Sequence, residues 1–265
     1  MGHMPELVSY LRDALLAGDV ETTRASNHGN AAAFADGHEG YLFGLPPLKT
    51  WTLAEVLGVM AERVGIDPDP ERSTGTDVID PYKTVAALDR MRDRLREAAH
   101  RKERVLVASG HPAGIVEVHL AVVVALRAAG CEILTPAAGA PFARPGRYDG
   151  REFPLAVRYI GGVAMGAERG IAMWHTHSPD GMREMLGELE RTGQPMPDLV
   201  FADHGFAGAA AAAGLDVVSF ADSNDPALFV GEAEGRVSVT VPIDDNVQPH
   251  LYGPISAYLL EGIAA

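Results

Sequence analysis

The stretch VLVASGHPAGIVEVHLAVVVALRAAGCEIL, residues 105–134, decides the fold because it contains a strand, a turn, a helix and a second strand in that order. The apolar run at 105–108 has the length of a buried strand. The apolar residues from 115 to 129 continue long enough for a helix, and Gly130 stands where a helix ends. Strand–helix–strand units are typical of doubly wound parallel sheets. We therefore predict an α/β protein with a mostly parallel sheet in a three-layer, Rossmann-like arrangement.

The residues before this stretch carry helix signals. Either Thr50 or Thr52 is the expected cap of a helix that ends at Val64. Pro81 is expected to open a further helix that runs to about Arg101, with Asp80 as its cap. Loops rich in glycine and proline are expected at residues 26–48 and 65–80.

These patterns divide the chain into two parts. Residues 5–102 are predicted to form a helical N-terminal region or cap, and residues 103–265 an α/β catalytic core, as two units or as one compact domain. Residues 135–152 are rich in proline, glycine and arginine and are expected to form a surface loop or lid. Further strands are expected near residues 157–160, 171–174, 199–201, 217–220 and 237–241, and helices at 179–191 and 253–261.

The charge of the chain limits its partners. Its 265 residues include 22 Lys and Arg against 36 Asp and Glu, a formal net charge of −14. Because this charge repels phosphate backbones and anionic lipids, we predict no nucleic-acid and no membrane partner. The single cysteine, Cys131, cannot form an internal disulfide, and no apolar run is long enough to cross a bilayer. We expect a cytoplasmic protein and leave homo-oligomerisation open.

Each of five predicted strands is followed by His, Asp or Asn. If the strands are parallel, their carboxyl ends lie along one edge, where α/β proteins bind ligands. The residues after the strands are, in order, His111; His175 and His177; Asp203 and His204; Asp222, Asn224 and Asp225; and Asp244, Asp245 and Asn246.

Simpler roles exist for several of these residues. Asp203, Asn224 and Asp225 each stand where a helix cap is needed, and the pair Asp244-Asp245 is compatible with a solvated turn. The pair His175 and His177 is harder to dismiss, because side chains two apart on an extended segment point to the same face. Such a pair is compatible with two ligands on one metal or with a phosphate clamp.

We assign chemical roles to these residues as expectations. Asp203, His204, His175 and His177 are the expected catalytic centre. Asp222, Asn224, Asp225, Asp244 and Asp245 are expected to bind a divalent metal such as Mg²⁺, Mn²⁺ or Zn²⁺. Ser109, Gly110, His111 and Gly114 are expected to hold a phosphate, aided by Arg24 and Asn27. A metal-free mechanism with Asp or His as nucleophile stays open.

Common nucleotide fingerprints are absent. The glycine loop at 110–114 has no Lys-Ser or Lys-Thr after it and lacks the three-glycine dinucleotide spacing. We therefore predict no nucleotide cofactor.

The motifs SGHPAG, WHTHS, ADHG, DSNDPAL and PIDDNV, with Arg24, Asn27 and Asp77 to Pro81, resemble an actinobacterial family labelled only phosphatase. The resemblance spans most of the chain and implies hydrolysis of a small phosphorylated metabolite, such as a nucleoside, sugar or cyclitol phosphate. Two alternatives use the same residues. One is a metal-dependent isomerase, aldolase or lyase acting on a sugar phosphate. The other is a non-catalytic metabolite-binding protein.

Overall fold

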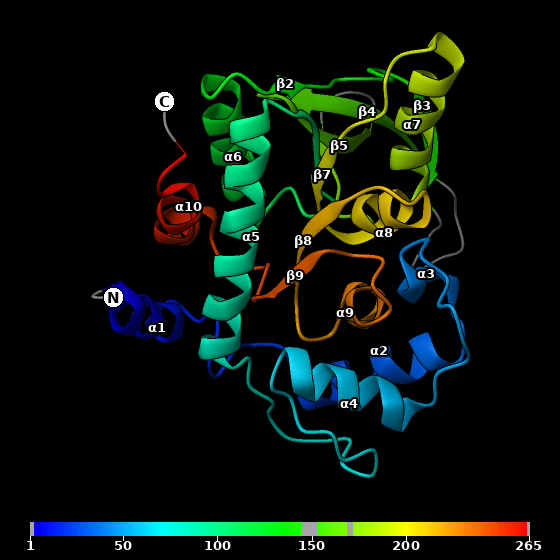
Figure 1. The fold of residues 1–265 in the computed structure, drawn as a ribbon. Helices are drawn as coiled ribbons and strands as arrows, with labels where there is room; N and C mark the ends of the chain where they lie inside the picture. The colour runs from blue at the N-terminus through cyan, green and yellow to red at the C-terminus, as the bar shows by residue number, and fades with distance from the viewer. Residues whose placement is uncertain (1–2, 145–152, 169–171, 264–265) are drawn as a thin grey trace.

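The computed structural model describes residues 3–144, 153–168 and 172–263, and within these ranges it contains a nine-stranded mixed sheet (Figure 1). The main path of the sheet runs in the order β3-β4-β5-β1-β7-β8-β9, with β2 paired to β1 and β6 paired to β5. The strands are β1 (Arg104–Ala108), β2 (Glu132–Ile133), β3 (Pro141–Arg144), β4 (Phe153–Ile160), β5 (Val163–Glu168), β6 (Ala172–Met173), β7 (Leu199–Ala202), β8 (Val217–Ala221) and β9 (Val239–Pro242).

The sheet has a parallel part and an antiparallel part. Strand β1 pairs in parallel with β2, β5 and β7, and β7, β8 and β9 continue in parallel. The strands β3, β4, β5 and β6 pair with one another antiparallel. Every residue of β7, β8 and β9 is buried, as expected for parallel strands covered on both faces. The predicted α/β fold with a mostly parallel sheet is confirmed.

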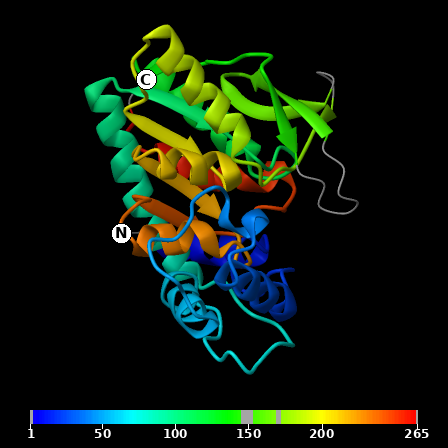
Figure 2. The same ribbon diagram turned by 90° about the vertical axis from the view of Figure 1, so that its right-hand side faces the viewer.

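Helices cover both faces of the sheet and produce three layers (Figures 1 and 2). On one face α5 packs against β9 and α6 against β1. On the other face α8 and α9 pack against β7, β8 and β9. The helices of these layers are α5 (Pro81–Arg101), α6 (Val116–Ala128), α7 (Asp180–Thr192), α8 (His204–Ala212), α9 (Pro226–Ala233) and α10 (Gly253–Leu260), with a 3₁₀ turn at Pro249–Tyr252.

The N-terminal part contributes α1 (His3–Asp13), α2 (Arg24–Ala35), α3 (Glu39–Leu42) and α4 (Leu53–Arg63), of which α2, α3 and α4 pack against α9. The caps expected from the sequence are present. Thr52 and Glu55 form a capping box on α4, and the Asp80 carboxylate accepts a hydrogen bond from the Tyr82 amide at the start of α5. The division at residue 102 stays a prediction, and α5 from the first part lies on the sheet itself.

Three sequence expectations differ from the structure. The expected loop at 26–48 was wrong, because most of it forms α2 and α3. Strand β5 was missed, and the strand expected at 171–174 is β6, which runs antiparallel and is described from residue 172. The expected surface loop at 135–152 contains β3, and its residues 145–152, with Arg147 and Arg151, lie outside the described residues.

The core lies on both sides of β1, β7, β8 and β9, and Cys131 is buried within it. In the described ranges, no helix combines the length and the apolar character needed to cross a bilayer.

Candidate active site

A cleft of about 210 Å³ lies where the carboxyl ends of β1, β7, β8 and β9 meet. The position agrees with the general placement of ligand sites in parallel α/β sheets. The cleft is lined by Thr22, Asn30, His111, His175, His177, His204, Asp222, Asn224, Asp225, Asp245 and Asn246. Eight of these were expected from the sequence as catalytic, metal-binding or substrate-binding residues.

His175 and His177 reach the cleft by an unexpected route. Strand β5 starts beside the end of β1, with Ala164 opposite Ala108, and therefore extends beyond the edge of the parallel strands. Strand β6 turns back along β5 and returns the chain to that edge. There the Thr176 amide donates a hydrogen bond to the Gly110 carbonyl oxygen at 2.9 Å. An antiparallel return thus delivers the two histidines to the edge that a parallel strand was expected to supply.

Three overlapping groups of possible metal ligands lie at the cleft, and each of their members except Asp244 is a lining residue. Within each group the ligand atoms lie within 4.8 Å of one another. We call the first the histidine end, His175, His177 and His204, and the last the carboxylate end, Asp222, Asp244 and Asp245. A middle group, His204, Asp225 and Asp245, shares one residue with each end.

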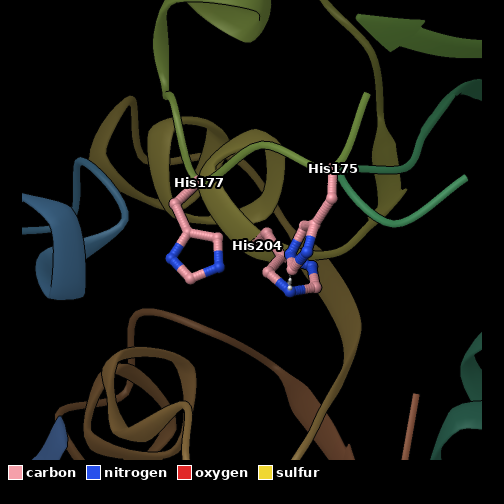
Figure 3. A group of neighbouring side chains, drawn as sticks. All are labelled: His175, His177 and His204. Atoms are coloured by element: carbon pink, nitrogen blue, oxygen red, sulfur yellow. Dashed lines mark hydrogen bonds between the residues drawn. The ribbon is translucent and has the colours of Figure 1, made fainter. Parts of the chain in front are cut away.

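At the histidine end the three imidazoles extend into the same space (Figure 3). The Nε2 atoms of His175 and His204 lie 3.2 Å apart. Two ring nitrogens this close share either a proton or a cation, because two lone pairs repel. Neutral imidazole is also a common metal ligand, so this donor set fits a divalent cation.

His204 is oriented by Asp203 behind it. The Asp203 side chain is fully buried, and its Oδ1 lies 2.8 Å from His204 Nδ1. This bond turns His204 Nε2 toward the cleft, 3.5 Å from both Asp225 Oδ2 and Asp245 Oδ2. Burial alone lowers the pKa of His204, but the hydrogen bond with Asp203 and the charges of Asp245 and Asp203 raise it to about 10.

The backbone at His204 is strained. Its φ of 48° lies in the left-handed region, which is unfavourable for a residue with a Cβ. Such strain costs on the order of 1–3 kcal/mol and is typical of functional sites. The next residue, Gly205, packs against the backbone of His177 and Ser178 so closely that a Cβ there would clash. The start of α8 is therefore fitted to the segment that carries the other two histidines.

Asp203 is also held by groups other than His204. It accepts hydrogen bonds from Ser109 Oγ at 2.7 Å and from the Gly110 amide at 2.5 Å. His119 Nε2, on α6, lies 3.1 Å from its second oxygen. Burial alone raises the pKa of Asp203, but the hydrogen bonds from His119 and His204 outweigh burial and hold that pKa well below its usual range.

The carboxylate end gathers like charges in a buried place. Burial, followed by the charge of Asp244, raises the pKa of Asp222 to about 7. Burial also raises the pKa of Asp245 well above its usual range, and Asp245 Oδ2 has no hydrogen-bond partner among the described residues. A bound cation would relieve this repulsion and give that oxygen a partner, so the residues fit a divalent metal.

The glycine loop after β1 does not present its donors to the cleft. The donors of Ser109 and Gly110 are directed at Asp203, and the His111 amide donates to Ser109 Oγ at 3.0 Å. A Cβ on Gly114 would clash with the Asp245 carbonyl oxygen, so the loop packs directly against the backbone of Asp245. Of the four, only His111 lines the cleft, and burial and the neighbouring His204 lower its pKa to about 4.

Arg24 and Asn27 were expected to bind substrate, and neither lines the cleft. The Arg24 guanidinium is fully buried, and it donates to Asp77 and to three backbone carbonyl oxygens. Asn27 donates to Asp77 and lies 3.1 Å from the hydroxyl of Ser223. Both therefore lie behind the carboxylate end.

The capping alternatives can be compared with the structure directly. Asp203 and Asp225 occupy the N-cap positions of α8 and α9, but neither side chain makes a capping hydrogen bond. Asp244 accepts a hydrogen bond from the Asn246 amide at 3.0 Å, as in a turn, and also belongs to the carboxylate end. Asn224 lines the cleft and donates to Ser26 Oγ at 3.0 Å.

Sequence reasoning missed three residues. Thr22 donates a hydrogen bond to Asp222 Oδ2 at 2.5 Å, and Asn30 lines the cleft. Neither comes directly after a strand, so the strand-end pattern holds no signal for them. The third, His119, lies on α6, where its Nδ1 is 3.2 Å from the Ile115 carbonyl oxygen. The sequence shows only a histidine within an apolar helix, and this does not predict its contact with Asp203.

The chain is similar to known proteins over almost its full length. A protein family described as Phosphatase matches residues 3–265. The chain is also 46% identical over 257 residues to Phosphatase SCO2771 of Streptomyces coelicolor, which covers 96% of this chain and 94% of that protein.

Proposed function

Because the chain belongs to this phosphatase family, we propose that it hydrolyses the phosphomonoester of a small metabolite with divalent cations held in the cleft. The observation that carries the proposal is the continuous series of three ligand groups along the cleft, joined through His204 and Asp245. Asp245 is the shared carboxylate, and a carboxylate has two oxygens to offer two ions. The series therefore provides ligands for two cations.

The two ends favour different metals. The histidine end suits a borderline metal such as Zn²⁺ or Mn²⁺, whereas the carboxylate end suits Mg²⁺ or Mn²⁺. When bound, such cations polarise phosphoryl oxygens and lower the pKa of a bound water. The chain's own residues orient these ligands. Asp203 fixes the ring of His204, and the loop at Gly114 supports Asp245.

This arrangement disfavours Asp203 as a nucleophile. The side chain is fully buried, and donors from Ser109, Gly110 and His204 occupy its oxygens. A nucleophile needs an oxygen that a substrate phosphorus can approach in line. We therefore assign Asp203 a positioning role toward His204. His111, whose lowered pKa leaves it neutral at pH 7, is proposed to hydrogen-bond a substrate oxygen.

The lining of the cleft supports a polyhydroxylated substrate. The described residues that line it are His, Asp, Asn and Thr, with no Phe, Tyr, Trp or aliphatic side chain among them. Such a lining offers many hydrogen bonds to hydroxyl groups, and it lacks the large aromatic faces of Phe, Tyr and Trp on which a base stacks best. We propose a sugar or cyclitol phosphate in preference to a nucleoside phosphate. No Lys or Arg of the described ranges lines the cleft, so bound divalent cations would supply positive charge beside that of His204.

The test is inorganic phosphate release from sugar, cyclitol and nucleoside phosphates, each assayed with EDTA and then with Mg²⁺, Mn²⁺ or Zn²⁺ restored. We expect release from polyol phosphates that EDTA abolishes and one metal restores. Release that is unaffected by EDTA would contradict the cation centre. Release only from nucleoside phosphates would contradict the proposed substrate class, while metal-dependent isomerisation without phosphate release would favour the sugar-phosphate isomerase.

A further inference from the structure

We propose that the segment from Thr22 to Phe43 is a positioning element that orients the metal ligands of both ends of the cleft from behind. The inference rests on the proposed cation centre and goes beyond it, because it assigns a role to a part of the chain that supplies none of the ligands. The segment contains α2, α3 and their flanking residues.

At the carboxylate end the segment holds one oxygen of Asp222 directly and contacts Ser223, which holds the other. Thr22 Oγ1 donates to Oδ2 at 2.5 Å. Oδ1 accepts from the Ser223 amide at 2.6 Å, and the Ser223 hydroxyl lies between this oxygen and Asn27 Oδ1, at 3.2 and 3.1 Å. With donors on both oxygens, the carboxylate has one orientation, and its remaining lone pairs are available to a cation beside Asp244 and Asp245.

The support continues into a buried ion pair. Asn27 Nδ2 donates to Asp77 Oδ2 at 2.9 Å, and Arg24 Nη1 lies 3.1 Å from the same oxygen. The side chains of Arg24 and Asp77 are buried, so Asn27 is held in one rotamer between Asp77 and Ser223. Arg24 and Asn27, which were expected to bind substrate, are therefore part of a series of hydrogen bonds that leads to Asp222.

A second set of bonds joins the same two segments. Asn30 Nδ2 donates to the Asn224 carbonyl oxygen at 2.7 Å, and Asn224 Nδ2 donates to Ser26 Oγ at 3.0 Å. The loop between β8 and α9, which carries Asp222 and Asp225, is thus bound to α2 at several points. A loop held this way keeps its ligands in place before any cation arrives.

At the histidine end the segment sets the orientation of His177. Its Nδ1 lies 3.2 Å from the Gly40 carbonyl oxygen. Because a carbonyl only accepts, Nδ1 carries the proton, and Nε2 is left as the ligand atom. The Phe43 ring packs edge-on against the His177 ring at 4.7 Å and lies 5.4 Å from the His204 ring. Phe43 itself is buried with a φ of 54°, a strained conformation that its packing must maintain.

The experiment compares Thr22→Val with Thr22→Ser in the full chain. Mn²⁺ binding to the EDTA-treated protein is measured by calorimetry, without substrate, and each variant's Tm is recorded in EDTA. Thr192→Val is the matched control, because the Thr192 hydroxyl donates within its own helix, to the Glu188 and Leu189 carbonyls. Removing a partner that orients a metal ligand lowers metal affinity by about 10–100-fold. We expect a loss of this size in Thr22→Val, recovery in Thr22→Ser, and wild-type binding in Thr192→Val.

A second variant keeps the test decisive if Thr22→Val does not fold. Ser223→Ala removes the hydroxyl between Asn27 and Asp222, and we expect it to weaken Mn²⁺ binding in the same direction. Wild-type Mn²⁺ affinity in both Thr22→Val and Ser223→Ala would overturn the positioning role, as would equal losses in Thr22→Val and Thr22→Ser. A wild-type chain that binds no divalent cation would instead overturn the proposed cation centre, and this inference with it.

Discussion

Two residues of the histidine end, His175 and His177, come after a two-residue antiparallel strand, whereas the carboxylate end follows two fully buried parallel strands. The two ends also differ in exposure. His175 is exposed and His177 half-buried, while all three carboxylates of the other end are buried. Neutral imidazoles can approach one another at little electrostatic cost, but buried carboxylates repel, and burial raises their pKa values.

Because of this difference, substitutions at the two ends should change stability and activity in different ratios. Without cations, the carboxylate end opposes folding, because like charges are brought together in a place that water cannot reach. The histidine end contributes no comparable opposition, since the cationic ring of His204 is paired with Asp203. Substitutions at the carboxylate end should therefore change stability and activity in opposite directions, whereas substitutions of His175 or His177 should change activity alone.

The largest effect is expected for Asp245→Asn, which removes the carboxylate shared by two ligand groups. Cation stabilisation of the transition state amounts to several kcal/mol, so we expect kcat to fall roughly 10³-fold. Tm in EDTA should rise, by about 2–4 °C if the relieved repulsion amounts to about 1 kcal/mol. Phosphate release and thermal melting in EDTA measure the two effects.

Asp93→Asn is the matched control for Asp245→Asn. Asp93 is an exposed carboxylate 3.5 Å from Arg96 on α5, so its loss should leave both kcat and Tm close to wild type. A lower Tm for Asp245→Asn in EDTA would contradict the view that the carboxylate end opposes folding.

The sequence predicted the carboxylate end better than its surroundings. Asp222 and Asp244 were found because parallel strands bring the residues after their carboxyl ends to one edge of the sheet. His175 and His177 were found from their spacing, although the strand before them runs antiparallel. Thr22 could not be found, since it meets Asp222 across 200 positions of sequence and only the packing of α2 on α9 brings them together.

Two missed elements have local reasons. Strand β5, VAMGAE, is made mostly of small residues with a glycine inside, which weakens its strand signal. Helix α2 begins RASNHGN, and the stretch SNHGN within it consists of poor helix formers typical of a loop. It forms because Thr23 caps it and because packing against α4 and α9 outweighs its intrinsic propensity.

The second largest effect is expected for His177→Ala at the histidine end. Loss of a metal ligand should lower activity supported by Zn²⁺ or Mn²⁺ by at least about 100-fold, because even residues that only orient a ligand contribute 10–100-fold. Tm in EDTA should stay within the range of ordinary surface substitutions, since the ring is half-buried. Metal titrations of phosphate release check the first effect. A Tm in EDTA that rises as for Asp245→Asn would remove the distinction between the ends.

A smaller effect is expected when pH alone is changed in EDTA. Asp222 has a folded-state pKa of about 7 against 3.8 when unfolded, so the folded chain holds its proton longer and loses stability as pH rises through this range. His204, raised from 6.5 to about 10, contributes stability that is complete below pH 6.5 and is lost above it. Both groups therefore lower stability as pH rises, and Tm in EDTA should fall from pH 5 to pH 9. Saturating Mn²⁺ should reduce this fall, because a cation replaces the protons. A Tm in EDTA that rises over this range would contradict the assigned pKa shifts.

The smallest effect is expected far from the cleft, for Glu55→Gln in the capping box of α4. Hydrogen bonds from Lys49 and Thr52 lower the pKa of Glu55 to about 2, from 4.5. The sign is opposite to that of Asp222, because this carboxylate stabilises the folded chain above pH 4.5 and its contribution is lost as pH falls toward 2. Gln keeps the cap but not the charge, so Tm should decrease slightly and by the same amount at every pH from 5 to 9. The difference in Tm between variant and wild type, measured in EDTA across this range, isolates the cleft as the source of the pH dependence. If that difference grew with pH, exposed carboxylates such as Glu55 would also contribute to the fall in stability. The contrast between the buried carboxylate end and the rest of the surface would then no longer hold.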